Sequence, residues 1–198
     1  MLKRCTLFVL LGAIACGPTP KAEKRLESFG TVEMPAVVRF VAAKYFREGN
    51  NNPDAPAFDY KRPMILQVVD EFEKHLLGKV ETNVPATTMS IHRVAMIGKG
   101  DLLIKELGDR AETNLAYVWE LLARQPSPSD REGVLYSERQ SLPFIQNVFF
   151  IRGTDGNLWA VSVYWAELHS SEEDNYGWVI NAVPTSNPWD NDVRVFSR

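Results

Sequence analysis

Two stretches near the start of the chain carry apolar residues at the three-and-four spacing of a helix. The first, residues 34–48, has Pro35 near its start and Gly49 just past its end. Its repeating apolar positions are Val38, Val41, Ala42 and Tyr45. The second begins at Pro63 and ends at Gly78, with an apolar stripe of Ile65, Val68, Val69, Phe72 and Leu76. Proline at a helix start and glycine after its end are typical boundaries, so this pattern predicts two helices.

The pattern changes between residues 87 and 124. Residues 87–107 are rich in β-branched residues and are interrupted by glycines at 98 and 100, which indicates a hairpin, although Asp101 could equally cap a short helix. From about residue 110 to 124 the spacing is helical again. Asp109 and Glu112 have the spacing of a capping box, and the apolar stripe is Leu115, Val118, Trp119 and Leu122. We therefore predict a third helix there.

Residues 144–153 and 158–168 alternate with a period of two and flank the sequence Thr-Asp-Gly-Asn. Asp155-Gly156 favours a type I′ turn, because both of its central residues need a positive φ. With these two as the loop, Arg152 pairs with Trp159 and Phe150 with Val161. The predicted core face is then Val148, Phe150, Trp159, Val161, Val163 and Trp165. The opposite face mixes the polar Asn147, Ser162 and Tyr164 with the apolar Ile145, Phe149 and Ile151.

Two further strands, residues 177–183 and 193–197, are expected to extend this sheet as a meander. The predicted class is α+β, with N-terminal helices packed on a curved antiparallel sheet. This order of elements resembles that of the NTF2-like or cystatin-like cone folds, in which helices and a bent sheet enclose a pocket. The resemblance implies no particular activity, because such folds host enzymes, binding modules and assembly components.

The first 15 residues have the parts of an export signal. Lys3 and Arg4 precede an almost wholly apolar run, residues 6–15, which ends at the small Ala15. About 20 apolar residues are needed to span a bilayer as a helix, so removal is expected rather than retention. Residues 13–16, Ala-Ile-Ala-Cys, resemble the lipobox of bacterial lipoprotein precursors, with Leu11 two places earlier than the leucine of that motif.

The resemblance implies that Cys16 becomes the lipid-modified first residue of an envelope protein. Gly17 in place of Asp after the cysteine implies the outer membrane, facing the periplasm. An ordinary secretory signal cleaved near Ala15, with Cys16 as a free thiol, is the alternative. Because Cys5 would leave with the signal, no internal disulfide is expected in either case.

Composition sets the rest of the organisation. Residues 16–30 are polar beyond the cysteine, contain two prolines and lack an apolar period, so they read as a lipidated cysteine with a flexible tether. Residues 31–198 then form a single domain. The net charge of -3 and the lack of any basic run argue against a nucleic-acid partner.

Candidate chemistry is sparse. The three histidines are His75, His92 and His169: His75 is expected on the surface in the last turn of its helix, and His92 in a strand where it could face a pocket. The densest group of possible metal ligands is Glu167, His169, Glu172, Glu173 and Asp174, which we interpret as a solvated hairpin tip. Asp190, Asn191 and Asp192 lack the continuation of a calcium loop. We therefore predict no metal, no cofactor and no catalytic residue.

Three functions remain open. The first is a non-catalytic, membrane-anchored domain that docks another envelope protein, suggested by the anchor and by the late aromatics Trp178, Trp189 and Phe196. The second is a binder of a small apolar or amphipathic molecule through His92, Asn147, Ser162 and Tyr164, which requires a pocket at the mixed sheet face. The third is a hydrolase or isomerase with His92 or Glu167 as the base. Cross-linking in intact cells separates the first from the others.

Overall fold

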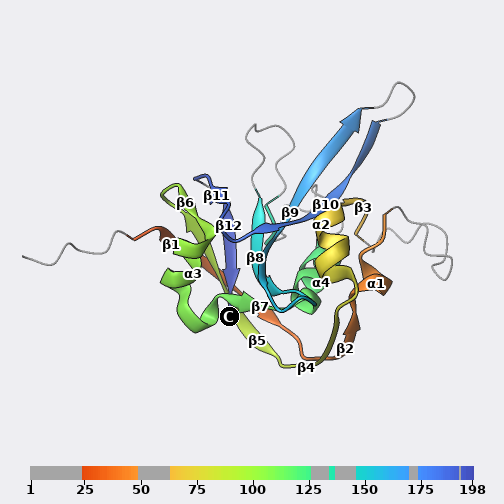
Figure 1. The fold of residues 1–198 in the computed structure, drawn as a ribbon, viewed down its shortest axis with the longest axis horizontal. Helices are drawn as coiled ribbons and strands as arrows, with labels where there is room; N and C mark the ends of the chain where they lie inside the picture. The colour runs from red at the N-terminus through yellow and green to blue at the C-terminus, as the bar shows by residue number, and fades with distance from the viewer. Residues whose placement is uncertain (1–23, 49–62, 126–133, 137–145, 170–173, 192) are drawn as a thin grey trace, which may run out of the picture.

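The computed structural model describes residues 24–48, 63–125, 134–136, 146–169, 174–191 and 193–198. Most strands form one mixed sheet (Figure 1). Its order is β1 (Leu26–Met34), β5 (Thr87–Val94), β12 (Arg194–Ser197), β8 (Asn147–Arg152), β9 (Leu158–His169), β10 (Asp174–Pro184) and β3 (Ile65–Val68), with β7 (Glu112–Thr113) beside β8. Neighbouring strands are antiparallel except in the pairs β12–β8, β10–β3 and β7–β8. Strands β2 (Val37–Val41) and β4 (Val80–Val84) form a small second sheet, and β6 (Gly98–Lys99) and β11 (Pro188–Trp189) form a third.

The helices are short. They are α1 (Ala42–Tyr45), α2 (Asp70–Phe72) with the π-helix η1 (Glu73–Leu77), α3 (Gly100–Leu107) with the 3-10 helix η2 (Gly108–Arg110), and α4 (Leu115–Arg124). A mostly antiparallel sheet combined with these helices confirms the α+β class.

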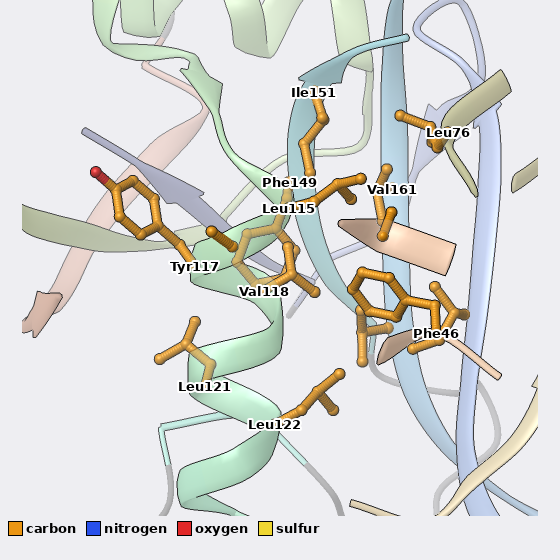
Figure 2. Close-up of a cluster of buried hydrophobic side chains, with 14 of the residues drawn as sticks. Phe46, Leu76, Leu115, Tyr117, Val118, Leu121, Leu122, Phe149, Ile151 and Val161 are labelled. Carbon is orange, nitrogen blue, oxygen red and sulfur yellow. The ribbon is translucent and has the colours of Figure 1, made fainter. Parts of the chain in front are cut away.

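Both faces of the sheet are buried. Helix α4 packs its apolar side, including Leu121 and Leu122, toward β8 and β9 in one cluster with Phe149 and Val161 (Figure 2). Helix α3 contributes Leu103 and Leu107 to a second cluster that holds Val148, Phe150 and Ala160. Neighbouring residues of a strand point to opposite faces, so β8 contributes alternately to two cores. The apolar side chains on the sheet face opposite α4 are therefore covered by α3.

The predicted N-terminal helix over residues 34–48 is wrong. Strand β2 occupies residues 37–41, and only Ala42–Tyr45 are helical. Val37 and Val41 are β-branched and pair across to β4, and this partner is distant in the sequence. The second prediction is right for residues 70–77, whereas residues 65–68 form β3 beside β10.

The remaining helix predictions have mixed outcomes. Residues 87–94 form β5, but α3 takes the place of the second hairpin strand, so the short helix is the alternative that holds. Helix α4 confirms the third helix from Leu115 onward. The proposed capping box is wrong, because Glu112 belongs to strand β7 and its carboxylate pairs with Arg152.

The β8–β9 hairpin is confirmed, but its predicted register is wrong by one residue. Ile151 pairs with Trp159 and Phe149 with Val161. Gly153 N–H donates to the Asn157 carbonyl at 2.8 Å, so the loop has three residues, 154–156. Gly156 has φ 80°, as expected for a type I turn followed by a left-handed residue. A one-residue shift moves one strand's side chains to the other face relative to its partner.

The end strands are placed differently from the predicted meander. Strand β10 follows β9 as expected, but β12 lies between β5 and β8. Strand β1 begins at Leu26, inside the segment 16–30 expected to be a tether. The resemblance to NTF2-like cone folds rested on an order of elements that begins with two helices. The observed order begins with strands β1 and β2, so the resemblance stays a prediction.

Candidate functional site

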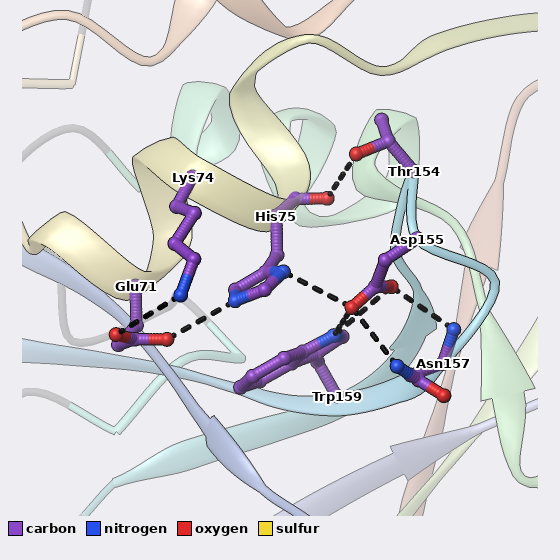
Figure 3. A network of polar contacts seen from close by, with 7 residues as sticks. All are labelled: Glu71, Lys74, His75, Thr154, Asp155, Asn157 and Trp159. Carbon is purple, nitrogen blue, oxygen red and sulfur yellow. Dashed lines mark hydrogen bonds and ion pairs between the residues drawn. The ribbon is translucent and has the colours of Figure 1, made fainter.

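The tip of the β8–β9 hairpin is joined to the π-helix η1 by a polar network (Figure 3). His75 Nδ1 lies 3.0 Å from the Asp155 carboxylate, and His75 Nε2 lies 3.1 Å from Glu71. The imidazole stacks on Trp159 with ring centroids 4.0 Å apart. Thr154 N–H and its hydroxyl both donate to the His75 carbonyl, at 2.8 and 3.1 Å. The network holds the turn against the helix.

Asp155 is the centre of this network. Burial raises the pKa of its carboxyl, but hydrogen bonds from the Asn157 backbone and side chain and from the Trp159 indole, together with His75, outweigh it and lower the pKa below its ordinary value. Both nitrogens of His75 face carboxylates. Neither nitrogen is directed at open space, so the arrangement fits a structural bridge better than proton transfer.

An open groove of about 380 Å³ lies beside this network. Its walls are Asn157, Leu158, Trp159, Pro184, Thr185 and Ser186, from the start of β9 and the end of β10. The lining combines an indole and a proline ring with amide and hydroxyl groups and contains no charged side chain. Such a groove suits a neutral or amphipathic molecule.

The structure does not bring the four predicted ligand residues together. Asn147 pairs with Val163, whereas Ser162 pairs with Val148, so Asn147 points to the opposite face from Ser162 and Tyr164. His92 shares the face of Ser162 but sits three strands away, which corresponds to roughly 14 Å. The predicted set was drawn from the wrong hairpin register.

Each of the four also has its own surroundings. Asn147 is fully buried, and its amide donates to the carbonyls of Tyr136 and Val163 at 3.0 Å, so it anchors a loop. The Ser162 hydroxyl is buried without a hydrogen-bond partner in the described part of the chain. Burial raises the pKa of Tyr164, which is half-buried.

His92 has a serine partner. Its Nε2 lies 3.0 Å from the Ser197 hydroxyl, and burial, followed by the charge of Arg110, lowers the pKa of the imidazole. A neutral histidine beside a serine is the start of a nucleophilic pair, but Ser197 is fully buried and no substrate reaches its oxygen.

The other predicted features fall into three groups. Cys16, Glu172, Glu173 and Asp192 lie outside the described residues, as do the side chains of Glu167, His169 and Asp174. Among the side chains that are described, no group of three or more His, Cys, Asp or Glu could hold a metal ion. Trp178, Trp189 and Phe196, expected as interface aromatics, are buried in the core.

Strands β9 and β10 continue beyond their neighbours as a two-stranded arm, which Figure 1 shows extending away from the rest of the molecule. Among the described residues, β8 pairs with β9 as far as Val163, and β3 pairs with β10 over residues 178–180. At the base of this arm Trp165 and Trp178 pack edge to face, 5.3 Å apart. Gly177 allows β3 to approach closely, since a Cβ there would lie 2.7 Å from Leu66 Cβ.

Sequence reasoning missed the network, and it predicted the β9–β10 hairpin but not its extension beyond the neighbouring strands. His75, expected on the surface, has a side chain only 14% exposed. The sequence Asp155-Gly156 predicted the turn. It could not predict the contact of this turn with a helix 80 residues earlier, because no local sequence pattern encodes such a tertiary contact.

Comparison with known protein families, curated proteins and solved structures finds no match to this chain. Within the described ranges, no helix is long and apolar enough to cross a membrane. Function is therefore inferred from the residues themselves.

Proposed function

We propose that this protein is a lipid-anchored domain of the bacterial cell envelope, held to the outer membrane through Cys16, that docks another envelope protein without catalysis. Its anchor is supported by the export signal and the lipobox-like residues 13–16. Its docking role is supported by the β9–β10 arm.

The arm is the observation that carries the docking role. Beyond Val163 and before Trp178, the described parts of β9 and β10 pair with each other and with no further strand. A two-stranded hairpin is marginally stable alone, and a strand from a partner can extend its sheet. A partner that adds such a strand stabilises the arm.

Neither histidine with described contacts favours a reaction. Both nitrogens of His75 face carboxylates, and the Ser197 hydroxyl beside His92 is buried. A docking role requires neither a nucleophile nor a general base.

Site-specific photo-cross-linking in intact cells tests the docking role. A photoreactive residue replaces Ala166 on the arm in one variant and Lys44 on α1 in the control. We expect a cross-linked adduct with a single envelope protein from position 166 and none from position 44. The purified partner should then bind the wild-type chain and lose affinity for Ala166→Arg but not for Lys44→Glu. Equal adducts at both positions, or none at 166, would contradict the proposal.

The anchor has a separate test. The mature protein extracted from its own membranes should have the mass of a chain that begins at Cys16 with acyl chains attached. An unmodified Cys16 would remove the anchor and leave the docking role to the cross-linking result.

The groove beside Trp159 favours a second function, binding of a small amphipathic ligand. A fatty acid such as palmitate should then raise the melting temperature of the wild-type chain. Thr185→Trp, which fills the groove, should abolish the rise, while Lys44→Glu keeps it. A rise that Thr185→Trp leaves unchanged would exclude this groove.

A further inference from the structure

The chain enters the folded domain at a fixed point beside helix α3. Arg25 N–H donates to Glu106 Oε2 at 2.9 Å, and Leu26 N–H donates to Glu106 Oε1 at 3.2 Å. A single carboxylate on α3 therefore holds the two residues that begin β1. The start of β1, strand β6 and helix α3 lie together at one end of the molecule (Figure 1).

The proposed lipid on Cys16 keeps this end close to the membrane. Ten residues lead from Cys16 to Leu26, and in any conformation they span at most about 35 Å. A domain of this size is about 40 Å across. The tether is therefore shorter than the domain, and the surface around Leu26 is the one that meets the lipid first.

That end of the molecule carries two exposed apolar side chains. Ile97 is 58% exposed and Leu102 is 42% exposed. Arg25 Nη1 donates to the Ile97 carbonyl at 3.5 Å, which places Ile97 directly at the entry point of the chain. Leu102 lies in the first turn of α3, on the same end of the molecule.

Basic side chains lie close in the chain to the two apolar ones. Lys105 stands three residues after Leu102, the spacing of neighbours on one helix face, and Lys99 directly precedes α3 on strand β6; both are exposed. Lys24, also exposed, directly precedes the entry point. The exposed acids here are Asp101, Glu106, which accepts from two backbone N–H groups, and Asp190, which follows the strand paired with β6. With Arg25 counted beside the three lysines, cations outnumber acids by one at this end of the molecule.

We infer that Ile97 and Leu102, with Lys24, Lys99 and Lys105 around them, form a contact surface for the anionic phospholipids of the membrane that carries the anchor. The inference rests on the proposed lipid anchor. Apolar side chains enter the headgroup boundary while lysines are attracted to anionic lipid, and the tether supplies the proximity. The β9–β10 arm extends from the opposite side of the molecule and so points away from the lipid (Figure 1).

The test uses the full, lipidated chain in vesicles of phosphatidylglycerol and phosphatidylethanolamine that contain a lipid with a quencher on its acyl chain. An environment-sensitive fluorophore is attached at Leu102→Cys or, as control, at Val38→Cys. Val38 is an exposed apolar residue on β2, at the far end of the molecule from α3. We expect a blue shift and strong quenching at position 102 and neither at 38. Equal signals at the two positions would overturn the inference.

Charge variants separate lipid contact from other causes. Each lysine-to-glutamate change, at Lys99 and at Lys105, should weaken the contact about fivefold at low salt and less at high salt. Lys44→Glu is the matched control on α1 and should have no effect. Quenching at 102 that is indifferent to both lysines and to salt would contradict an anionic lipid surface, and quenching that requires a second membrane protein would assign the surface to that protein.

Failure of the anchor is recognised separately by the mass of the mature chain. If Cys16 carries no lipid, the surface is judged from the Cys16→Ser chain, in which the fluorophore at 102 is again read with the same vesicles. Quenching at position 102 in that chain supports the lipid-contact surface without the anchor. Absence of quenching there, together with an unmodified Cys16, rejects both the surface and the anchor.

Discussion

Glu81 supplies a cap that helix α4 does not obtain from its own N-terminus. The N-cap residue Asn114 makes no side-chain cap hydrogen bond. Instead, Leu115 and Ala116 donate their N–H groups to the two carboxylate oxygens of Glu81, at 3.0 and 2.9 Å. The carboxylate is buried, and Lys79 lies 3.1 Å from it. A carboxylate on β4 thus accepts hydrogen bonds from the first N–H groups of a helix that begins 34 residues later.

Glu81→Gln should destabilise the fold by about 1–3 kcal/mol, because the amide has one acceptor oxygen where two N–H groups need one each. Urea unfolding followed by circular dichroism measures the change. Glu73→Gln, an exposed glutamate of the π-helix, is the control and should stay within about 0.5 kcal/mol of the wild type. Similar losses in both variants would mean that Glu81 is not a cap.

Asp155 makes a pH-dependent contribution to stability. Its pKa is lower in the folded chain than in the unfolded chain, so the charged form stabilises the fold. This stabilisation is complete above the ordinary value, about 4, and is lost as pH falls through the lower folded-state pKa. Wild type should therefore be more stable than Asp155→Asn at pH 5, with the difference closing toward pH 3.

Chemical denaturation of both chains from pH 3 to 6 measures this difference. A gap between wild type and Asp155→Asn that stays constant down to pH 3 would contradict the assigned hydrogen bonds.

At the scale of elements, the loop of the β8–β9 hairpin depends on Gly156. Its φ of 80° is strained for any residue with a Cβ, so Gly156→Ala should cost about 1–2 kcal/mol. Gly78 also ends an element, η1, but has φ -73°, and a Cβ there would make an ordinary contact with Thr154 Cγ2 at 4.0 Å. Gly78→Ala should be neutral or stabilising by about 0.5 kcal/mol. Thermal unfolding compares the two, and equal effects would argue for a different turn.

The same hairpin shows how far sequence patterns reach. Alternation located both strands, and Asp155-Gly156 located the turn. The loop length was not encoded in these signals, since Asp-Gly fits both a two-residue and a three-residue loop. The choice depends on Asp155 bonding to His75 and Trp159, contacts that the local sequence does not contain.

The candidate site failed for the same reason. With the register moved by one residue, Asn147 separates from Ser162 and Tyr164, and the expected mixed face divides between two cores. Helix α4 was predictable because its apolar stripe is long and local, whereas β2 needed its partner β4 to reveal it.

At the scale of the whole molecule, one sheet separates two apolar clusters. Leu121 of α4 belongs to one cluster and Leu103 of α3 to the other, and both are fully buried. Strand β8 takes part in both through Phe149 and Phe150. Loss of either cluster exposes one face of the same strands, so neither half should remain folded without the other.

Leu121→Ala and Leu103→Ala should each destabilise the protein by about 2–5 kcal/mol, because each leaves a cavity in a packed core. The two losses should add in the double variant, since the side chains lie on opposite faces and share no contact cluster. Each variant should unfold in one transition seen equally by calorimetry and by tryptophan fluorescence. If the α3 side were an independent unit, Leu103→Ala would instead split the transition and leave the α4 cluster at its original midpoint.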